Sequence, residues 1–576
     1  MQSAQQNLLK NILAFLALFV FAWFLWGVNF QTLKYYTTFE DIQQVYWNAS
    51  YFANRVNAGM NPFVNSVFLF PDQTSLVMHM YTILFGLVNF FVNDPILAIN
   101  ITLFGNILFT AFGFYLLAGF WLKNNLFKIS VAFLSVFNGY FLAKLGLHLN
   151  LVLIGLVPFT VFFFLQSLDT EKPNIKNIRK FLLAIAFFVL NFIFDYYAVF
   201  YILVFLGIYY TYQWVLRKWF ADFSAKKGLI LGVLLIGLHL VSRTLFLHGF
   251  DHKGGIWESA DIQSMVIPNA LGYYFHSNIQ LDNTPATENF VFLGYTLVAL
   301  LCISVVLFLA NRKTLKNVNP LLFSLLLLLA VTFPDAKCGK THLFFMPTSF
   351  LHYIPFLDNI RSPSRFIELV LVVSALFCFQ VFEGVLSSKK VGKIAAGIVS
   401  FIFVVGVYFD HATQAPKEVS KNALAVNEMD KKTLANKIVL SFPFGIRDGL
   451  RGFGEFNLED YKLALIPGIK LLSGYFSRIP QSTWDRVQND SLLQILIQFE
   501  NTKINGEFNF RNALFDNNFL KWVVAHKIDV IRIDHKKYTH ETNSMMIFKK
   551  LYQMDLLEKK YDSANQVDYY FPKRTP

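Results

Sequence analysis

Long apolar runs separated by short polar connections fill the first 409 residues of the chain. A bilayer core about 30 Å thick takes about 20 apolar residues per helix, so we interpret each run as a membrane span. About eleven spans are predicted on this basis, at residues 8–28, 96–121, 128–147, 150–168, 180–194, 198–216, 228–247, 289–310, 319–333, 366–386 and 393–409. The first run ends without a cleavage signal, which indicates a retained span rather than a removed signal peptide.

The placement of residues 75–92 decides which side of the membrane each loop faces. This segment is apolar enough to span, but it is short and carries His79, so it could instead lie in the interface as an amphipathic helix. If it lies on the surface, all five basic clusters fall on the side of the N-terminus, as the positive-inside rule requires. If it spans, all five move outside. The clusters are Lys123/Lys128, Lys172/Lys176/Arg179/Lys180, Arg217/Lys218/Lys226/Lys227, Arg312/Lys314/Lys316 and Lys389/Lys390/Lys393.

The surface placement therefore predicts an interfacial helix at 75–92 in a protein of the plasma (inner) membrane, with a cytoplasmic N-terminus. The outer loops are then expected at 29–95, 148–149, 195–197, 248–288 and 334–365.

Residues 410–576 change character and become polar, with only short apolar runs. β-Branched residues favour strands at 437–442 and 528–533, and we expect helices at 491–500 and 518–526. This composition predicts a small extracytoplasmic α/β domain over 410–576 that follows a transmembrane domain over 1–409.

Composition supports a polytopic α-helical membrane protein and excludes other classes. Of the 576 residues, 55% are hydrophobic and only 15% are charged, whereas a soluble protein carries about 25% charged residues. The net charge of +13 reflects cytoplasmic loops that set the topology. No basic run combines with a nucleic-acid reader, so no nucleic-acid partner is expected. Three scattered cysteines without a CxxC pair indicate neither a disulfide framework nor a zinc site.

Unusual polar residues gather at the predicted outer ends of the spans. Glu40 and Asp41 follow the first span, where adjacent carboxylates beside lipid are costly and need a reason. A carboxylate can take a proton from an acceptor hydroxyl as a general base, and an arginine can bind phosphate oxygens in a planar fork. The sequence therefore favours a reaction on a lipid-linked phosphate, with Asp41 or Glu40 as base. The expected binding residues are His79, His148, Asp195, Glu258, Asp261, Arg361 and Arg365.

Each of these residues also has a structural interpretation. Asp41 could cap a helix or pair with a neighbour, and Glu40 could be a solvated neighbour of it. His79 and His148 could be satisfied structural histidines. Glu258 and Asp261 could organise their loop, while Arg361 and Arg365 could anchor an interface.

The pattern of motifs resembles the GT-C superfamily of membrane glycosyltransferases. The shared features are an acidic pair in the first outer loop, a surface helix, and a second true span that ends in a basic cytoplasmic turn. More specifically, several stretches resemble bacterial GT-C-like membrane proteins grouped near the YfhO family. These stretches are residues 57–63, 70–72 together with His79, 146–150, 195–197, 258–261 together with 268–269, Glu288 together with 293–295, 361–366, 440–444 and 473–478.

This resemblance implies a polyprenyl-phosphate-linked sugar donor and a glycan, lipid or protein acceptor at the outer face. It assigns Asp41 or Glu40 the role of base or of a residue that orients the acceptor. The Glu-Asp order differs from the Asp-Glu order common in the aminoarabinose-transferase-like branch, so both carboxylates stay candidates. A divalent cation near Glu40, Asp41 and Asp195 is conceivable, but no defined ligand spacing supports it.

Two other functions remain open at this stage. A transporter or flippase of a lipid-linked saccharide would favour ionisable residues at the membrane midplane and paired broken helices, and polar residues near the predicted outer ends argue against it. A non-catalytic scaffold for envelope assembly would use the outer domain alone. The discriminating observation is whether Asp41, Asp195 and Arg365 lie together.

Overall fold

The computed structural model describes most of the chain, and two compact units are found in it. The described residues are 2–27, 29–35, 40–76, 83–168, 175–216, 260–268, 270–277, 290–311, 315, 318–339, 341–346, 349, 362–386, 389–448, 451–476, 479–501, 514–538, 543–553 and 555–573. Unit 1 comprises Met1–Asp41 and Asn100–Glu418, and unit 2 comprises Ile42–Ile99 and Val419–Pro576. Residues from Ile42 onward, expected in the first outer loop, thus group with the C-terminal region.

Helices long and apolar enough to cross a membrane occur throughout the part of the chain that is described. Five meet this description: Leu8–Gly27, Pro95–Ala118, Asn177–Phe194, Pro363–Val385 and Gly392–His411. A bent pair, Asn125–Leu134 with Gly139–Leu145, makes a sixth if it counts as one span. Five shorter apolar helices accompany them, at Ile83–Val92, Val157–Leu168, Tyr197–Gln213, Tyr295–Ala310 and Asn319–Thr332. The chain is therefore a polytopic helical membrane protein, and the count of about eleven spans stays a prediction.

Each predicted span that falls within the described residues contains a helix of unit 1. The helices are α1 (Gln2–Ala22), α4 (Pro95–Ala118), α5 (Asn125–Leu134), α6 (Gly139–Leu147), α7 (Val157–Leu168), α8 (Ile175–Phe194), α9 (Tyr196–Tyr210), α12 (Tyr295–Ala310), α13 (Asn319–Thr332), α14 (Ile367–Val385) and α15 (Lys389–His411). Predicted span 228–247 lies outside the described residues.

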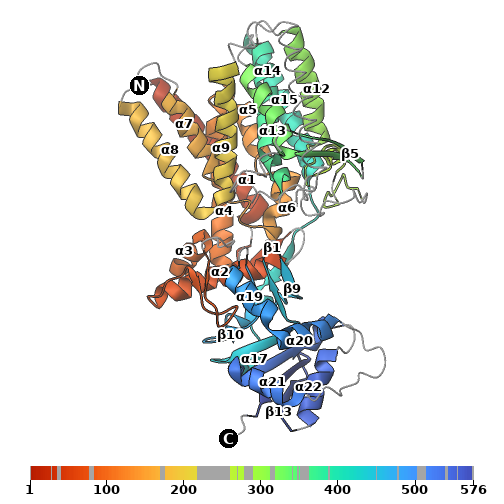
Figure 1. Cartoon of the computed structure of the whole chain (residues 1–576). Helices are drawn as coiled ribbons and strands as arrows, with labels where there is room; N and C mark the ends of the chain where they lie inside the picture. Colours follow the sequence, from red (N-terminus) through yellow and green to blue (C-terminus); the bar gives the residue numbers. More distant parts are fainter. Residues whose placement is uncertain are drawn as a thin grey trace. The chain divides into compact units, whose positions relative to one another are not determined.

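The helices of unit 1 run side by side in two groups (Figure 1). In one group α7 packs against α8 and α9; in the other α14 packs against α12 and α13. All residues from Ile367 to Phe379 of α14 are buried, which explains why this part of its sequence is apolar all round rather than on one stripe. By contrast α8 and α1 leave most apolar side chains exposed, as expected of helices that face lipid.

Predicted span 128–147 is broken into α5 and α6, which are bent by 45°. Asn138 caps α6, because its side-chain oxygen accepts a hydrogen bond from the backbone N–H of Phe141 at 2.9 Å. The break frees backbone groups that water cannot satisfy inside an apolar bundle, so neighbouring side chains must bind them.

Predicted span 150–168 is helical only from Val157, where α7 begins. Residues 149–156 form turns instead, and Asn106 of α4 satisfies their backbone. Its amide nitrogen donates to Val152 O at 2.5 Å, and its oxygen accepts from Gly155 N at 2.9 Å. A single buried asparagine thus makes the irregular segment tolerable among apolar helices.

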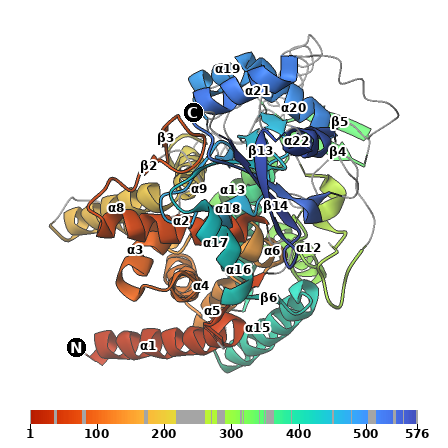
Figure 2. The same ribbon diagram turned by 90° about the horizontal axis from the view of Figure 1, so that it is seen from below.

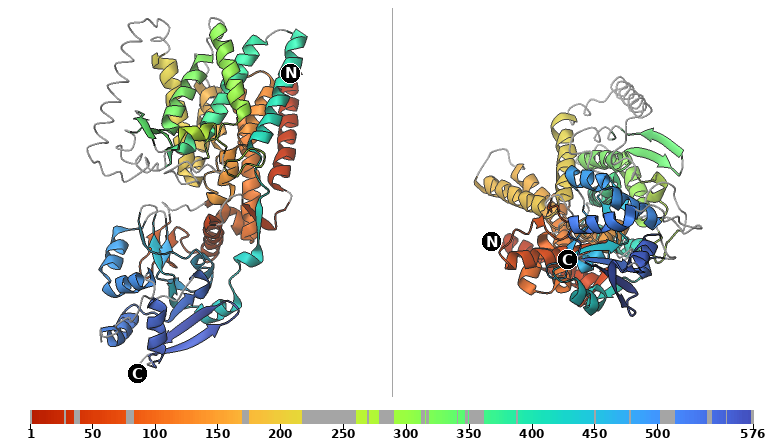
Figure 3. Two further views of the ribbon diagram at one scale, coloured as in Figure 1. Left: turned by 90° about the vertical axis from the view of Figure 1, so that its right-hand side faces the viewer. Right: turned by 60° about the horizontal axis from the view of Figure 1, so that its bottom comes forward.

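Unit 2 contains a five-stranded sheet in the order β10-β7-β12-β14-β13. The strands are β7 (Ile438–Phe442), β10 (Lys470–Leu471), β12 (Val530–Asp534), β13 (Leu557–Asp562) and β14 (Val567–Pro572). β10 and β12 flank β7 in parallel, whereas β14 is antiparallel to both β12 and β13. The dark-blue strands β13 and β14 lie beside α22 (Asn543–Gln553) in Figure 2, and the left view of Figure 3 shows the same strands from another side.

The strands and helices expected at 437–442, 528–533, 491–500 and 518–526 are confirmed as β7, β12, α20 (Ser491–Asn501) and α21 (Leu514–Ala525). The remaining elements of unit 2 range from an 18-residue helix to strands of two residues. They include α2 (Glu40–Asn57), which begins in unit 1, β2 (Val64–Asn65), β3 (Thr74–Ser75), α3 (Ile83–Val92), α16 (Lys421–Leu424), α17 (Glu428–Leu434), β8 (Gly445–Arg447), β9 (Gly452–Gly454), α18 (Asp460–Leu463), β11 (Gly474–Tyr475) and α19 (Gln481–Asn489). The interfacial placement of 75–92 stays a prediction.

The segment that follows α2 joins the edge of this sheet. Leu471 N donates to Val67 O at 2.7 Å, and Phe70 N donates to Leu471 O at 3.0 Å. Trp47 and Phe68 enter the same apolar core as Tyr461 and Phe476. Backbone pairing along β10 together with this aromatic packing explains why Ile42–Ile99 belongs to unit 2.

A network of buried polar side chains connects strands of the sheet in unit 2 with neighbouring helices. Arg532 Nε contacts Asp430 Oδ1 at 3.0 Å, and the Tyr569 hydroxyl donates to the same oxygen at 2.7 Å. Asp460 accepts hydrogen bonds from Ser441 at 2.9 Å and from Ser473 at 2.5 Å. Burial raises the pKa of Asp460 to about 6, against the pull of these donors and of Arg532.

We predict that Asp460→Asn gains stability relative to the wild type as pH rises from 4.5 to 7.5. The folded-state pKa of Asp460 lies above its unfolded value, so ionisation destabilises the wild type as pH rises between the two values, whereas asparagine does not ionise. A shift of about two units corresponds to a cost on the order of 3 kcal/mol. Thermal unfolding of both proteins in detergent across this pH range measures the difference in Tm, and a difference independent of pH would contradict the prediction.

Candidate functional site

The imidazole of His148 contacts the carboxylate of Asp41 in unit 1. Nδ1 of His148 lies against Oδ2 of Asp41, and the two side chains are 28% and 13% exposed. Asp41 is the second residue of α2, and His148 is the residue that ends α6. The contact joins two sequence-predicted residues from different loops and leaves both within reach of solvent.

Asp195 is bound by Asn150, which lies two residues after His148 in the same turn. Asn150 donates from Nδ2 to Asp195 Oδ2 at 3.1 Å, while Asp195 Oδ1 accepts from Tyr197 N at 2.7 Å. The second bond makes Asp195 the N-cap of α9. Asp195 is therefore partly explained as a helix cap, and it also presents a buried carboxylate beside the turn that carries His148.

Arg365 lies near Asp195 through Tyr197, the second residue of the helix that Asp195 caps. Its guanidinium carbon stands 5.0 Å from the ring centroid of Tyr197, and its charge acts on Asp195. The Tyr201 hydroxyl donates to Arg365 O at 3.1 Å, which fixes the backbone where the short helix η9 (Pro363–Phe366) leads into α14. The side chain is half-buried, so one face of the guanidinium meets protein and part of it stays accessible.

These contacts bring four predicted residues, Asp41, His148, Asp195 and Arg365, into one network within unit 1. Asp41 contacts His148 and Asn150 donates to Asp195, and His148 and Asn150 belong to one turn. Arg365 stands over the ring of Tyr197, whose backbone N–H donates to Asp195. We call these residues together with Asn150 the acid–base network. It contains two carboxylates, one imidazole and one guanidinium, which are the groups needed to move a proton and to balance a phosphate charge.

Sequence reasoning missed a second set of buried polar residues next to this network. Glu368, only 1% exposed, accepts from Asn138 Nδ2 at 3.0 Å, and its other oxygen has no partner among the described residues. His411 Nδ1 accepts from Gly139 N at 3.1 Å. Both contacts hold the start of α6, the helix that ends at His148. The sequence signal that could have identified Glu368 is an ionisable residue inside an apolar span, three residues after Arg365.

Other predicted site residues lie elsewhere or cannot be placed. Asp261 is fully buried, accepts from Gln263 N at 2.7 Å and also from Gly339 N, and so ties η4 (Ile262–Met265) to β4 (Asp335–Cys338) and the turn after it. These contacts organise the loop to which Asp261 belongs. His79, Glu258 and Arg361 lie outside the described residues, and Glu40 is described only as the first residue of α2.

A metal site is not formed by the described side chains. No group of three His, Cys, Asp or Glu residues converges among them. Asp41 and His148 provide only two donor groups, and three or more are usual for a protein-bound cation. The described residues therefore do not by themselves fit a divalent cation.

The sequence matches no protein-family model and no curated protein. Solved structures similar to this chain include two oligosaccharyltransferases from Archaeoglobus fulgidus. One, AglB in complex with an inhibitory peptide and a dolichol-phosphate, is 10% identical with a TM-score of 0.43, over 98% of this chain and 75% of that chain. The other, in complex with Zn and sulfate, is 10% identical with a TM-score of 0.44, over 97% of this chain and 72% of that chain.

We predict that Glu368→Leu destabilises the protein while Glu368→Gln does not. Glutamine keeps an oxygen acceptor for Asn138, whereas leucine leaves a buried amide N–H unpaired at a cost of about 1–3 kcal/mol. The measurement is thermal unfolding of the purified variants in detergent, with the wild type alongside. Equal losses of Tm in the two variants would show that the hydrogen bond to Asn138 is not what Glu368 contributes.

Proposed function

We propose that the chain is a membrane glycosyltransferase that moves a sugar from a polyprenyl-phosphate donor to a hydroxyl acceptor. The observation that carries the proposal is the acid–base network, in which Asp41 contacts His148, Asn150 of the same turn binds Asp195, and Arg365 stands over the ring of Tyr197, whose backbone also binds Asp195. A general base and a phosphate-binding cation must be close to each other for this reaction, since the acceptor oxygen that loses its proton attacks the same sugar carbon from which the phosphate departs.

The proposed reaction is an inverting displacement at the anomeric carbon. The acceptor hydroxyl oxygen attacks the anomeric carbon while its proton passes to the carboxylate of Asp41. The bond between the anomeric carbon and the phosphate oxygen breaks on the opposite face, and its electron pair leaves with the lipid phosphate. Arg365 compensates the charge that develops on that oxygen.

His148 acts as the partner that orients Asp41. An imidazole N–H at Nδ1 would hold one carboxylate oxygen and leave the other for the acceptor proton. The reverse assignment, with His148 as base and Asp41 as its orienting carboxylate, uses the same contact. Replacement of each residue in turn separates the two roles, because loss of the base is the more severe defect.

Asp195 and Asn150 position Arg365 rather than react. Asp195 is buried and accepts hydrogen bonds from Asn150 and from the backbone of α9, so its carboxyl group is held in one position. The ring of Tyr197 then supports the guanidinium from one side. A positioned arginine loses less conformational freedom when it binds phosphate than a mobile one would.

The proposed setting is the plasma membrane, with about eleven spans, a cytoplasmic N-terminus and the α/β region outside. The network would then lie at the outer face, where a lipid-linked donor and a glycan, lipid or protein acceptor meet. His79, Glu258 and Arg361 stay proposed lining residues. A divalent cation would need Glu40 as a third donor beside Asp41 and His148, and loss of activity with a chelator would reveal it.

The two other functions receive less support from the acid–base network. A flippase has no need for an imidazole on a carboxylate near a phosphate-binding arginine, and a scaffold has no need for Asp41, Asp195 and Arg365 to be linked at all. Their linkage favours the enzyme over both.

We predict that Asp41→Asn lowers glycan transfer by about 100-fold or more, a loss of the size that removal of a general base produces. Asparagine can still accept a hydrogen bond from His148 and should leave folding intact. Transfer is measured in membranes supplied with radiolabelled polyprenyl-phosphate sugars at matched expression. His148→Gln is tested alongside and should lose less activity if Asp41 is the base; a larger loss in His148→Gln would assign the proton to the imidazole.

We predict that Arg365→Gln raises the KM for the donor and lowers kcat, because glutamine leaves the leaving phosphate without a compensating charge. Arg447→Gln serves as the matched control. Arg447 also stands over a tyrosine, with its guanidinium carbon 5.5 Å from the ring centroid of Tyr475, but it belongs to unit 2. Steady-state transfer kinetics at varied donor concentration test both variants, and similar behaviour of the two would remove Arg365 from the phosphate site.

A further inference from the structure

Residues 270–277 form an aromatic segment attached just beyond the end of α15, and we call it the aromatic ledge. Tyr273 N donates to Ala412 O at 2.7 Å, and Gln414 N donates to Leu271 O at 3.2 Å. Gly272 and Thr413 pair between these two bonds as an isolated antiparallel bridge. The backbone of the ledge is therefore fixed to the chain that leaves α15.

The ledge packs its rings against the ends of two apolar helices. Tyr274 meets Phe409 of α15 with ring centroids 4.8 Å apart, and Phe275 meets Tyr295 of α12 at 5.3 Å. These rings nevertheless stay exposed: Tyr274 by 46%, Phe275 by 41% and Tyr295 by 44%. A contiguous exposed aromatic surface of this kind marks an interaction site.

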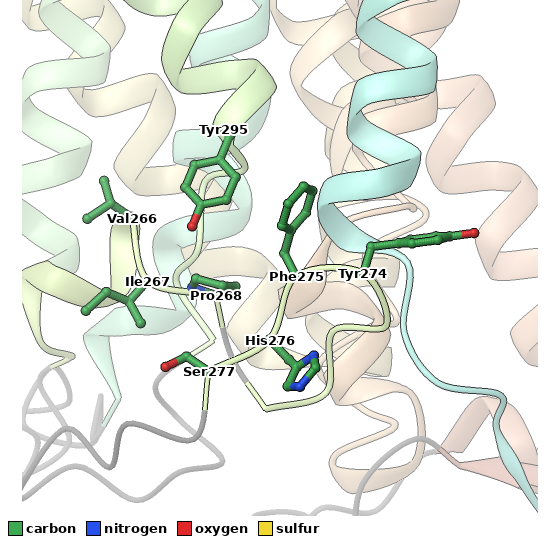
Figure 4. Close-up of a pocket in the computed structure, with 8 residues that line it drawn as sticks. All are labelled: Val266, Ile267, Pro268, Tyr274, Phe275, His276, Ser277 and Tyr295. Atoms are coloured by element: carbon green, nitrogen blue, oxygen red, sulfur yellow. The ribbon is translucent and has the colours of Figure 1, made fainter.

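A hollow of about 400 Å³ opens between the ledge and the start of α12. Val266, Ile267, Phe275 and Tyr295 line its apolar part, as Figure 4 shows. His276 and Ser277 add polar atoms where the ledge turns away. Apolar walls with a few polar groups at one end suit an amphiphilic ligand.

The position of the ledge along α15 indicates which amphiphile covers it. The candidate span Gly392–His411 has 20 residues, and at about 1.5 Å per residue it crosses about 30 Å, the thickness of the bilayer core. The ledge joins the chain at the end of this span, where tyrosine and tryptophan gather in membrane proteins. The exposed residues Ile398, Phe401 and Ile402 extend the apolar surface along the same helix.

We infer that the hollow seats one phospholipid of the surrounding leaflet. Its acyl chain lies against Phe275 and Tyr295, and its glycerol-ester carbonyls accept hydrogen bonds from the hydroxyl groups and imidazole of the polar end. The eight described lining residues include no lysine or arginine, which suits a zwitterionic phospholipid, whose choline carries its own counter-charge, better than an anionic polyprenyl phosphate. Arg365 is not among them, so the lipid site is distinct from the donor site proposed there.

The test uses the full chain in phosphatidylcholine nanodiscs that contain a phosphatidylcholine with a photoactivatable diazirine in its acyl chain. After irradiation, labelled peptides are mapped by mass spectrometry. We expect the peptide with residues 266–277 to be labelled several-fold more than α8, where Phe192 is 64% exposed. Phe275→Ser should lower this labelling several-fold and leave labelling of α8 unchanged.

Tyr273→Ser is the matched control variant. Tyr273 lies on the same ledge and is 59% exposed, but it does not line the hollow, so its replacement should leave labelling at the wild-type level. Equal labelling of the ledge and of α8, unaffected by Phe275→Ser, would overturn the inference. Labelling by a diazirine-bearing polyprenyl phosphate that excess phosphatidylcholine does not displace would overturn it as well, and would assign the hollow to the donor.

Discussion

Backbone polar groups that lie among apolar helices must find partners inside the protein, and unit 1 depends on how they do so. The chain leaves helical geometry twice in succession, between α5 and α6 and again over residues 149–156. At the first break, Glu368 and His411 accept hydrogen bonds from Asn138 and Gly139. At the second break, the side chain of Asn106 binds the backbone. His148 and Asn150 stand between these two supports, so the irregular backbone places the acid–base network.

Hydropathy revealed the helices but could not reveal these breaks. A run of apolar residues is needed for a bilayer whether the helix is straight or bent, so residues 128–147 read as one span although α5 and α6 meet at 45°. The supporting residues are single polar side chains from distant helices, and no local pattern connects Asn106 with Gly155. Strands β7 and β12 were predictable because their β-branched residues are a local signal, whereas the pairing of Val67 with Leu471 joins distant parts of the sequence.

The candidate site shows the same difference between local signals, which the sequence reveals, and contacts between distant residues, which it does not. Asp41, His148, Asp195 and Arg365 could be chosen from the sequence because an ionisable residue at the end of an apolar run is unusual wherever it falls. Their mutual contacts could not, since they depend on how the ends of four helices meet. Glu368 was overlooked because it lies within a predicted span. The same kind of signal also came from Asp261, whose carboxylate caps a turn and binds a neighbouring loop; its place in the site stays a prediction.

The charges of the acid–base network fit the requirements of the proposed transfer. A sugar linked to a polyprenyl phosphate is a phosphodiester with one negative charge, and the departing lipid phosphate gains a second. Whenever Asp195 is ionised, its charge partly offsets that of Arg365 before any phosphate arrives, which weakens ground-state binding. The attraction then grows as the leaving oxygen becomes negative, and an interaction that strengthens along the reaction lowers the barrier more than it tightens the substrate. A half-buried arginine near a carboxyl group is thus suited to the leaving phosphate.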